Sequence, residues 1–115
     1  MVKGYIKIDR SILENETFRN AQTMYLFLFL ALNANWGETA DGLKPGQLYV
    51  SINDLKKHIG ISKPTITDRL QALEQAQIIT RELSGKKLKI TINKFIKFGH
   101  DTGKKSAEYR NPFGH

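Results

Sequence analysis

The sequence predicts an α+β domain, mainly helical, that is built as a winged helix-turn-helix with a small antiparallel β-hairpin as its wing. Three observations predict it: a strongly apolar helical segment, two short helix patterns joined by a glycine turn, and two alternating strand patterns that follow. With 115 residues the chain has the length of one domain and can bury a hydrophobic core. It contains no cysteine, which excludes a disulfide framework, and we expect a cytoplasmic protein.

The first half of the chain predicts a short extended segment and then a buried helix. Residues 4–8 alternate in polarity, and Asp9 after them is suited to cap a small helix. An expected helix over 21–34, begun by Asn20 or Thr23, contains nine consecutive apolar residues. A helix that is apolar on every side is not a surface helix. It is either the central core helix alone or also the contact of a homodimer, and the sequence leaves both open.

The middle of the chain changes from turn chemistry to helix chemistry. Residues 36–46 are rich in glycine and turn-forming residues, and a short strand pattern over 47–50 follows them. Ser51 and Asp54 then have the spacing of a capping box, which marks the start of a helix.

Two short helices are expected on either side of Gly60. The first covers 52–59 and ends at Gly60, because glycine adopts the left-handed conformation of a helix end at the lowest cost. Ser62 caps the second helix, which tolerates Pro64 in its first turn and runs to about Gln77. The spacing of this pair predicts a helix-turn-helix.

The second helix of the pair is the expected recognition helix. Its buried side is marked by Ile66, Leu70 and Leu73, so its polar residues face outward. Short polar side chains at a helix N-terminus suit the DNA major groove, and the terminal amides suit phosphate. The alternative is that Ser62 and Thr65 only cap the helix. The candidate DNA-binding residues here are Ser62, Lys63, Thr65, Thr67, Asp68, Arg69 and Gln71.

A basic hairpin is expected after the helix pair. Residues 78–83 predict one strand, Ser84 and Gly85 predict the tip, and apolar and basic residues alternate over 87–92. The lysines suit the phosphate backbone or the minor groove of DNA. The alternative is a solvated strand face on which lysine prevents aggregation. The candidate residues on the wing and its flanks are Lys56, Lys57, Ser84, Lys86, Lys87 and Lys89.

The positive charge of the protein is concentrated in the same half of the chain. The net charge is +7, and residues 1–50 contribute five basic and five acidic residues, so their sum is zero. Residues 51–115 carry thirteen Lys or Arg residues against six Asp or Glu residues. A one-sided basic field indicates a polyanionic partner. The nine-residue apolar run is too short for a membrane span, which needs about 20 residues, so we expect no membrane partner.

The chain resembles a known family of replication proteins. Residues 4–15, GYIKIDRSILEN, are similar to the start of the N-terminal domains of phage replisome organisers and DnaD-like primosomal proteins. The resemblance continues through the apolar helix, the Pro45-Gly46-Gln47 turn and residues 62–73, and it covers about residues 4–97. It implies a bacterial, phage or mobile-element protein that binds duplex DNA and self-associates. Residues 99–115 are shorter than the further C-terminal domain of those proteins.

The expected domain covers residues 1–98, and residues 99–115 are expected to form a basic tail. The tail contains Gly103-Lys104-Lys105-Ser106, which lacks the first glycine of a phosphate-binding loop because Phe98 stands at that position. The three histidines are too scattered for a metal site, and no catalytic set is apparent. We therefore expect no cofactor, no metal and no enzymatic activity.

The sequence thus predicts a sequence-preferring double-stranded DNA-binding protein of phage, plasmid or mobile-element type. An accessory role in replication or DNA transfer, with replication or transfer proteins as further partners, is the first expectation. A winged-helix transcriptional regulator is one alternative. A winged-helix module that binds another protein is a second alternative. Loss of binding to duplex DNA of random sequence at moderate salt would favour that module over a DNA-binding protein.

Overall fold

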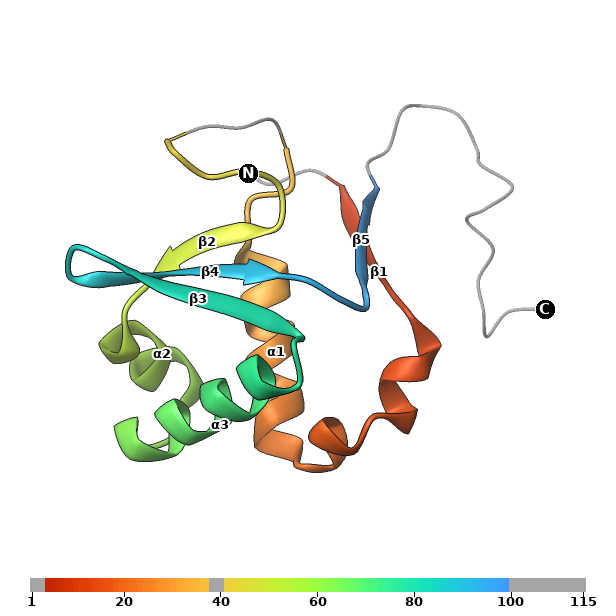
Figure 1. The fold of residues 1–115 in the computed structure, drawn as a ribbon, viewed down its shortest axis with the longest axis horizontal. Helices are drawn as coiled ribbons and strands as arrows, with labels where there is room; N and C mark the ends of the chain where they lie inside the picture. Colours follow the sequence, from red (N-terminus) through yellow and green to blue (C-terminus); the bar gives the residue numbers. More distant parts are fainter. Residues whose placement is uncertain (1–3, 38–40, 100–115) are drawn as a thin grey trace.

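In residues 4–37 and 41–99, which the computed structural model describes, three α-helices pack against a three-stranded antiparallel sheet, and a separate two-stranded ribbon lies beside them (Figure 1). The predicted α+β class is confirmed. In chain order the elements are β1 (Tyr5–Ile8), the 3-10 helices η1 (Arg10–Glu14) and η2 (Glu16–Arg19), α1 (Ala21–Asn33), β2 (Gln47–Val50), α2 (Ile52–Ile59), α3 (Lys63–Gln75), β3 (Ile79–Ser84), β4 (Lys87–Ile92) and β5 (Ile96–Gly99).

Helix α1 supplies the largest part of the core. It begins after Asn20, whose side-chain oxygen accepts the backbone N–H of Thr23 at 3.1 Å, so Asn20 is the N-cap. The helix ends at Asn33, with Ala34 as its C-cap. Its environment is not apolar on every side, because Tyr25 and Leu32 remain 52% and 62% exposed. The buried face consists of Thr23, Leu26, Phe27, Leu30 and Ala31.

The predicted helix pair forms with its predicted caps. The Ser51 hydroxyl accepts the Asp54 N–H at 3.0 Å, and an Asp54 carboxylate oxygen accepts the Ser51 N–H at 3.3 Å. Gly60 ends α2 with φ at 81°, in the left-handed region that favours glycine. Leu55 of α2 and Leu70 of α3 are fully buried, and they hold the two helices together.

Helix α3 ends two residues earlier than the sequence predicts. Gln77 has φ at 62°, its N–H bonds to the Glu74 carbonyl, and the Ile78 N–H bonds to the Leu73 carbonyl at 3.0 Å. These are the two bonds of a Schellman motif, with Gln77 at the left-handed position that glycine usually occupies. The helix end was predicted too late because no glycine marks it.

The sheet has the strand order β2-β4-β3, so the last strand lies between the other two. Strands β3 and β4 form the predicted hairpin, and Figure 1 shows it extending beyond the helices. Ser84 pairs with Lys87, which makes Gly85 and Lys86 the two loop residues. The loop is therefore one residue later than the predicted Ser84-Gly85 tip. Gly85 has φ at 63° at the first loop position, where a type II′ turn requires glycine.

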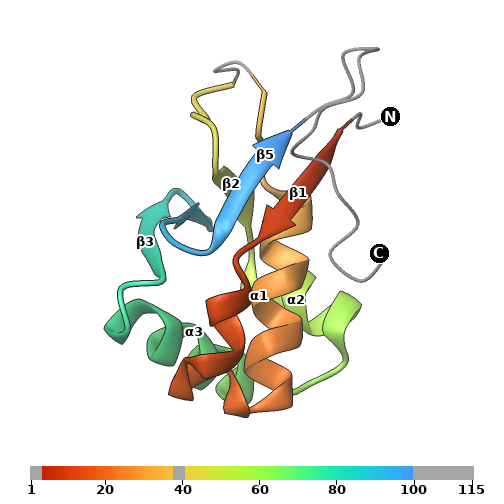
Figure 2. The same cartoon turned by 90° about the vertical axis from the view of Figure 1, so that its right-hand side faces the viewer.

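The ribbon of β1 and β5 departs from the sequence prediction, which ends the domain at residue 98. The two strands pair antiparallel from Tyr5 with Gly99 to Ile8 with Ile96, so Gly99 belongs to the ribbon. Figure 2 shows the two strands side by side above one end of α1. The Phe98 ring stacks on Trp36, with ring centroids 6.3 Å apart, which attaches β5 to the chain after α1. The remainder of the predicted tail, residues 100–115, lies outside the described residues.

The capping box at the start of α2 makes a measurable prediction. Its hydrogen bonds with Ser51 hold the pKa of Asp54 below the ordinary 3.8, and the nearby Lys87 and His58 charges act in the same direction. We expect Ser51→Ala to raise that pKa toward 3.8 and to cost about 1 kcal/mol of stability through loss of the cap. A pH titration followed by NMR gives the Asp54 pKa.

The pH dependence of stability has a defined sign at this site. Because folding lowers the Asp54 pKa, the carboxylate stabilises the fold fully above pH 3.8, and this contribution is lost as the pH falls through the lowered pKa. Asn53→Ala is the control: Asn53 is exposed and precedes Asp54, and we expect its replacement to leave the Asp54 pKa unchanged. An unchanged Asp54 pKa in Ser51→Ala would contradict the capping box.

Candidate nucleic-acid interface

The outward face of α3 carries a polar stripe. Ile66, Leu70 and Leu73 are fully buried against the rest of the core, which turns the opposite side of the helix to solvent. Lys63, Thr67 and Gln71 are all exposed and follow each other at intervals of four residues, so they form one row along the helix. We call Lys63, Thr67 and Gln71 the α3 stripe. Asp68 is exposed beside it.

The first turn of α3 uses two of the predicted residues as structural groups. The Ser62 hydroxyl oxygen accepts the Thr65 N–H at 3.4 Å, and the same hydroxyl lies 2.9 Å from the Thr65 hydroxyl. Thr65 is half-buried. Ser62 is therefore the N-cap of α3, and Thr65 is bonded to it through both its N–H and its hydroxyl. Ser62 remains exposed, so its hydroxyl is still at the surface.

Arg69 is held by two neighbours and does not extend from the flank of α3. Its guanidinium lies 2.7 Å from the Asp68 carboxylate and donates to the Gln22 side-chain oxygen of α1 at 3.3 and 3.4 Å. Its side chain is 26% exposed, against 65% for that of Asp68. Arg69 thus neutralises Asp68 and connects α3 with α1, a role that the sequence did not indicate.

The hairpin places most of its predicted residues at the surface. Ser84, Lys86 and Lys87 are exposed at its end. Lys89 is half-buried, and it lies farther from the loop, directly between Tyr49 of β2 and Glu82 of β3. An acidic residue directly opposite offsets part of its charge. The basic end of the hairpin is therefore formed by Lys86 and Lys87, and Lys89 belongs to the outer face of the sheet.

The flank of the hairpin is close to α2. Leu88, which follows Lys87, pairs with Val50, the residue before the capping residue Ser51, so the loop end of β4 lies beside the start of α2. The Lys87 charge also acts to lower the pKa of Asp54. Lys56 and Lys57 are exposed in the same helix. On α2, His58 stacks on Phe29 of α1 with ring centroids 5.6 Å apart, so this histidine is a packing residue.

Two further features were not found from the sequence. Arg81 of β3 pairs with Glu74 of α3 at 3.1 Å, which connects the hairpin with α3. The second feature is strand β5 with its lysines: Lys94, before β5, and Lys97, on β5, are both exposed. The short alternation of Ile96, Lys97 and Phe98 is the sequence signal that could have indicated this strand.

Comparisons with known proteins give no relative for this chain. No family model matches it, and no curated protein and no solved structure matches it significantly. Within the described residues, no cluster of histidine and acidic side chains has the arrangement of a metal site. Nor does any helix in the same part of the chain have the length and apolar character to span a bilayer.

Proposed function

We propose that this chain is a winged helix that binds double-stranded DNA with a preference for certain sequences. The order of elements supports it: α1, β2, α2, α3 and the β3–β4 hairpin follow one another as in a winged helix, with β4 in the middle of the sheet. The observation that carries the proposal is the α3 stripe, an exposed polar row on the second helix of the pair, in a protein whose hairpin loop bears adjacent lysines.

In the proposed complex, α3 enters the major groove with the α3 stripe against the base edges. Lys63 donates to an acceptor on a base or phosphate, and the Thr67 hydroxyl bonds to a donor or an acceptor on a base edge. The Gln71 amide suits adenine, which presents one acceptor and one donor in the major groove. Lys86 and Lys87 contact phosphates beside the groove and add affinity without sequence information. Asp68 lies beside the α3 stripe as an ion pair with Arg69, so the pair adds no net charge to this part of the proposed contact.

A homodimer through α1 is part of the proposal. Tyr25 and Leu32 are exposed at positions seven residues apart, so they lie on the same side of α1. Leu28 and Phe29 lie between them in the sequence and are only half-buried. A second copy packed on this side would cover apolar surface and set the spacing of two half-sites on the DNA.

The resemblance to phage replisome organisers and DnaD-like proteins supports a role in a phage, plasmid or other mobile element. We infer an accessory role in replication or DNA transfer, with a transcriptional regulator as the second candidate. Both roles use the same contacts. The recovered DNA site distinguishes them, because a replication origin, a transfer origin and a promoter operator differ in their surroundings.

Binding to duplex DNA of random sequence is the first test. A protein that neutralises several phosphates binds random duplex at low salt, and the logarithm of its affinity falls linearly with the logarithm of salt concentration. Fluorescence anisotropy with a labelled duplex measures both quantities. Absence of binding at about 50 mM salt would contradict the proposal and favour the protein-binding module.

Gln71→Ala tests whether α3 reads bases. We expect a loss of about 1–3 kcal/mol in binding to the selected site, with little change on random duplex, because the amide contacts a base edge. The site is first selected from a random library with the wild-type protein. Asn53→Ala, which removes an exposed amide from α2 outside the α3 stripe, is the control. Equal weakening on selected and random DNA would show that Gln71 does not read sequence.

A further inference from the structure

Asp68 is an exposed acidic residue beside the α3 stripe. It follows Thr67 directly and precedes Gln71 by three residues, so its side chain is a neighbour of the Gln71 amide on the helix surface. Phosphates run along both sides of a helix that lies in the major groove. A carboxylate in this position repels phosphates that lie within a Debye length, about 8 Å at physiological salt. The proposed contact of α3 with DNA therefore requires a compensating positive charge next to Asp68.

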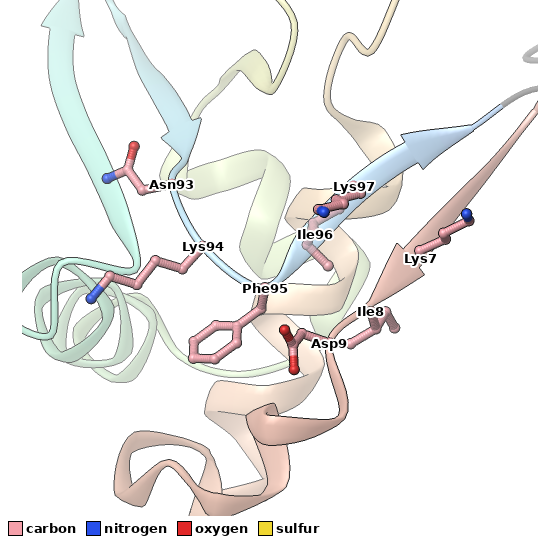
Figure 3. Close-up of a pocket in the computed structure, with 8 residues that line it drawn as sticks. All are labelled: Lys7, Ile8, Asp9, Asn93, Lys94, Phe95, Ile96 and Lys97. Carbon is pink, nitrogen blue, oxygen red and sulfur yellow. The ribbon is translucent and has the colours of Figure 1, made fainter. Parts of the chain in front are cut away.

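The Asp68 carboxylate has no role in capping a helix. Asp54 belongs to the capping box of α2, and Asp9 caps η1 by accepting the Ser11 N–H at 2.9 Å. Figure 3 shows Asp9 at the end of β1, where it lines a cavity of about 350 Å³. In the part of the chain that the structure describes, the only partner of the Asp68 carboxylate is Arg69. Compensation of the Asp68 charge thus depends on one side chain.

All three nitrogen atoms of the Arg69 guanidinium group are engaged. Nη1 lies 2.7 Å from the Asp68 carboxylate, and Nε and Nη2 donate to the Gln22 side-chain oxygen at 3.4 and 3.3 Å. Adjacent residues of a helix point about 100° apart, so the helix alone does not bring Asp68 and Arg69 together. An exposed ion pair of two flexible side chains is weak, because both must be ordered. The bonds to Gln22, on the neighbouring helix α1, hold the guanidinium group in place.

We propose that Gln22 is a positioning residue for DNA binding: it holds Arg69 against Asp68, and the neutralised pair allows α3 to approach the phosphates. The inference rests on the proposed function and adds to it a residue of α1, outside the helix pair. Arg69 is then a neutralising group and not a phosphate contact, in contrast to the expectation from the sequence. Because Gln22 has no charge, its effect on DNA binding acts through Arg69.

The first test compares changes in the ion pair with a charge control. Arg69→Gln leaves Asp68 unpaired, Arg69→Gln with Asp68→Asn restores the net charge of the wild type, and Lys44→Gln removes one exposed positive charge elsewhere. Anisotropy measures affinity for a random duplex of about 30 base pairs from about 50 to 200 mM salt. We expect Arg69→Gln to bind about tenfold more weakly than Lys44→Gln, because an unpaired carboxylate faces the phosphates. The double variant is expected to match the wild type in affinity and salt slope.

The second test addresses Gln22 directly. Gln22→Ala is expected to weaken binding to the random duplex about threefold, since an exposed ion pair without its anchor is open for part of the time. The same substitution, added to the double variant of Arg69 and Asp68, is expected to leave affinity unchanged. Gln22 is exposed, so we expect Gln22→Ala to keep the melting temperature of the wild type. This measurement separates positioning of Arg69 from a general loss of structure.

Each other result has a definite meaning. A double variant that loses affinity and about 0.9 in salt slope would show that Arg69 contacts a phosphate directly, and the neutralising role would be overturned. Equal binding by Arg69→Gln and Lys44→Gln would place Asp68 outside the contact and refute the inference, while the proposed function stands. An effect of Gln22→Ala that is equal in the wild type and in the double variant would refute its positioning role. If the wild-type protein binds no duplex, the proposed function itself has failed.

Discussion

Leu70→Ala is expected to destabilise the protein by about 2–5 kcal/mol and to lower its melting temperature by about 10 °C or more. Leu70 is fully buried in the core on α3, which packs against both α1 and α2. Removing three side-chain carbons leaves a cavity that rigid neighbouring helices fill only in part. A domain of this size is stable by only about 5–15 kcal/mol, so the loss is a large share of the total. Thermal unfolding followed by circular dichroism measures it.

Gln71→Ala is the matched control for stability, because it changes the next residue of the same helix. Gln71 is exposed, and an exposed substitution of this kind alters stability by no more than about 0.5 kcal/mol. The two neighbours therefore separate the fold from the proposed function: we expect Leu70→Ala to lower the melting temperature and Gln71→Ala to reduce base discrimination. A melting temperature for Leu70→Ala within a few degrees of the wild type would show that α3 is not anchored as the structure describes.

Lys86→Ala with Lys87→Ala is expected to weaken binding to selected and random duplex DNA alike. Loss of two phosphate contacts lowers the salt slope by about 1.8 and the affinity about tenfold or more at moderate salt. The reason is that phosphate contacts release counterions and carry no direct sequence information. Anisotropy over a salt series gives the slope, and Lys44→Gln measures the effect of losing one charge elsewhere.

A second measurement in the same variant does not depend on DNA. Lys87 is one of the charges that lower the Asp54 pKa, so its removal raises that pKa toward 3.8. A rise in the Asp54 pKa without a change in the DNA salt slope would confirm that the hairpin lies beside α2 and would show that its lysines do not contact phosphate. The position of the hairpin and its function are thus tested separately.

The parts of the fold that depend on neighbouring residues were predictable from the sequence. Ser51, Gly60 and Ser62 mark helix ends through their own hydrogen bonds and backbone preferences, and all three occupy the predicted positions. The end of α3 escaped prediction because Gln77 takes the left-handed position without a glycine signal. That conformation is selected by the Ile78 N–H bond to Leu73 and by the burial of Ile78 in the core, and neither is visible in the local pattern.

The parts of the candidate interface that depend on distant residues were not predictable. Arg69 was expected to contact phosphate, but its guanidinium bonds to Gln22, which lies 47 residues away in the sequence. Lys97 faces Lys7 only because the two ends of the described chain pair as a ribbon. An i+4 pattern shows which side of a helix is apolar, yet it does not show which polar residues find partners on another element.

The sequence by itself determined the α+β class, the helix pair with its caps, the hairpin and the concentration of basic residues after position 50. Each of these follows from backbone preference, periodicity or composition, which act over a few residues. Only the tertiary structure decided that Tyr25 and Leu32 remain exposed, that Arg69 is engaged by α1, and that Lys7 and Lys97 are cross-strand partners in the ribbon. These outcomes depend on which distant surfaces pack together, because burial and pairing are properties of the whole fold.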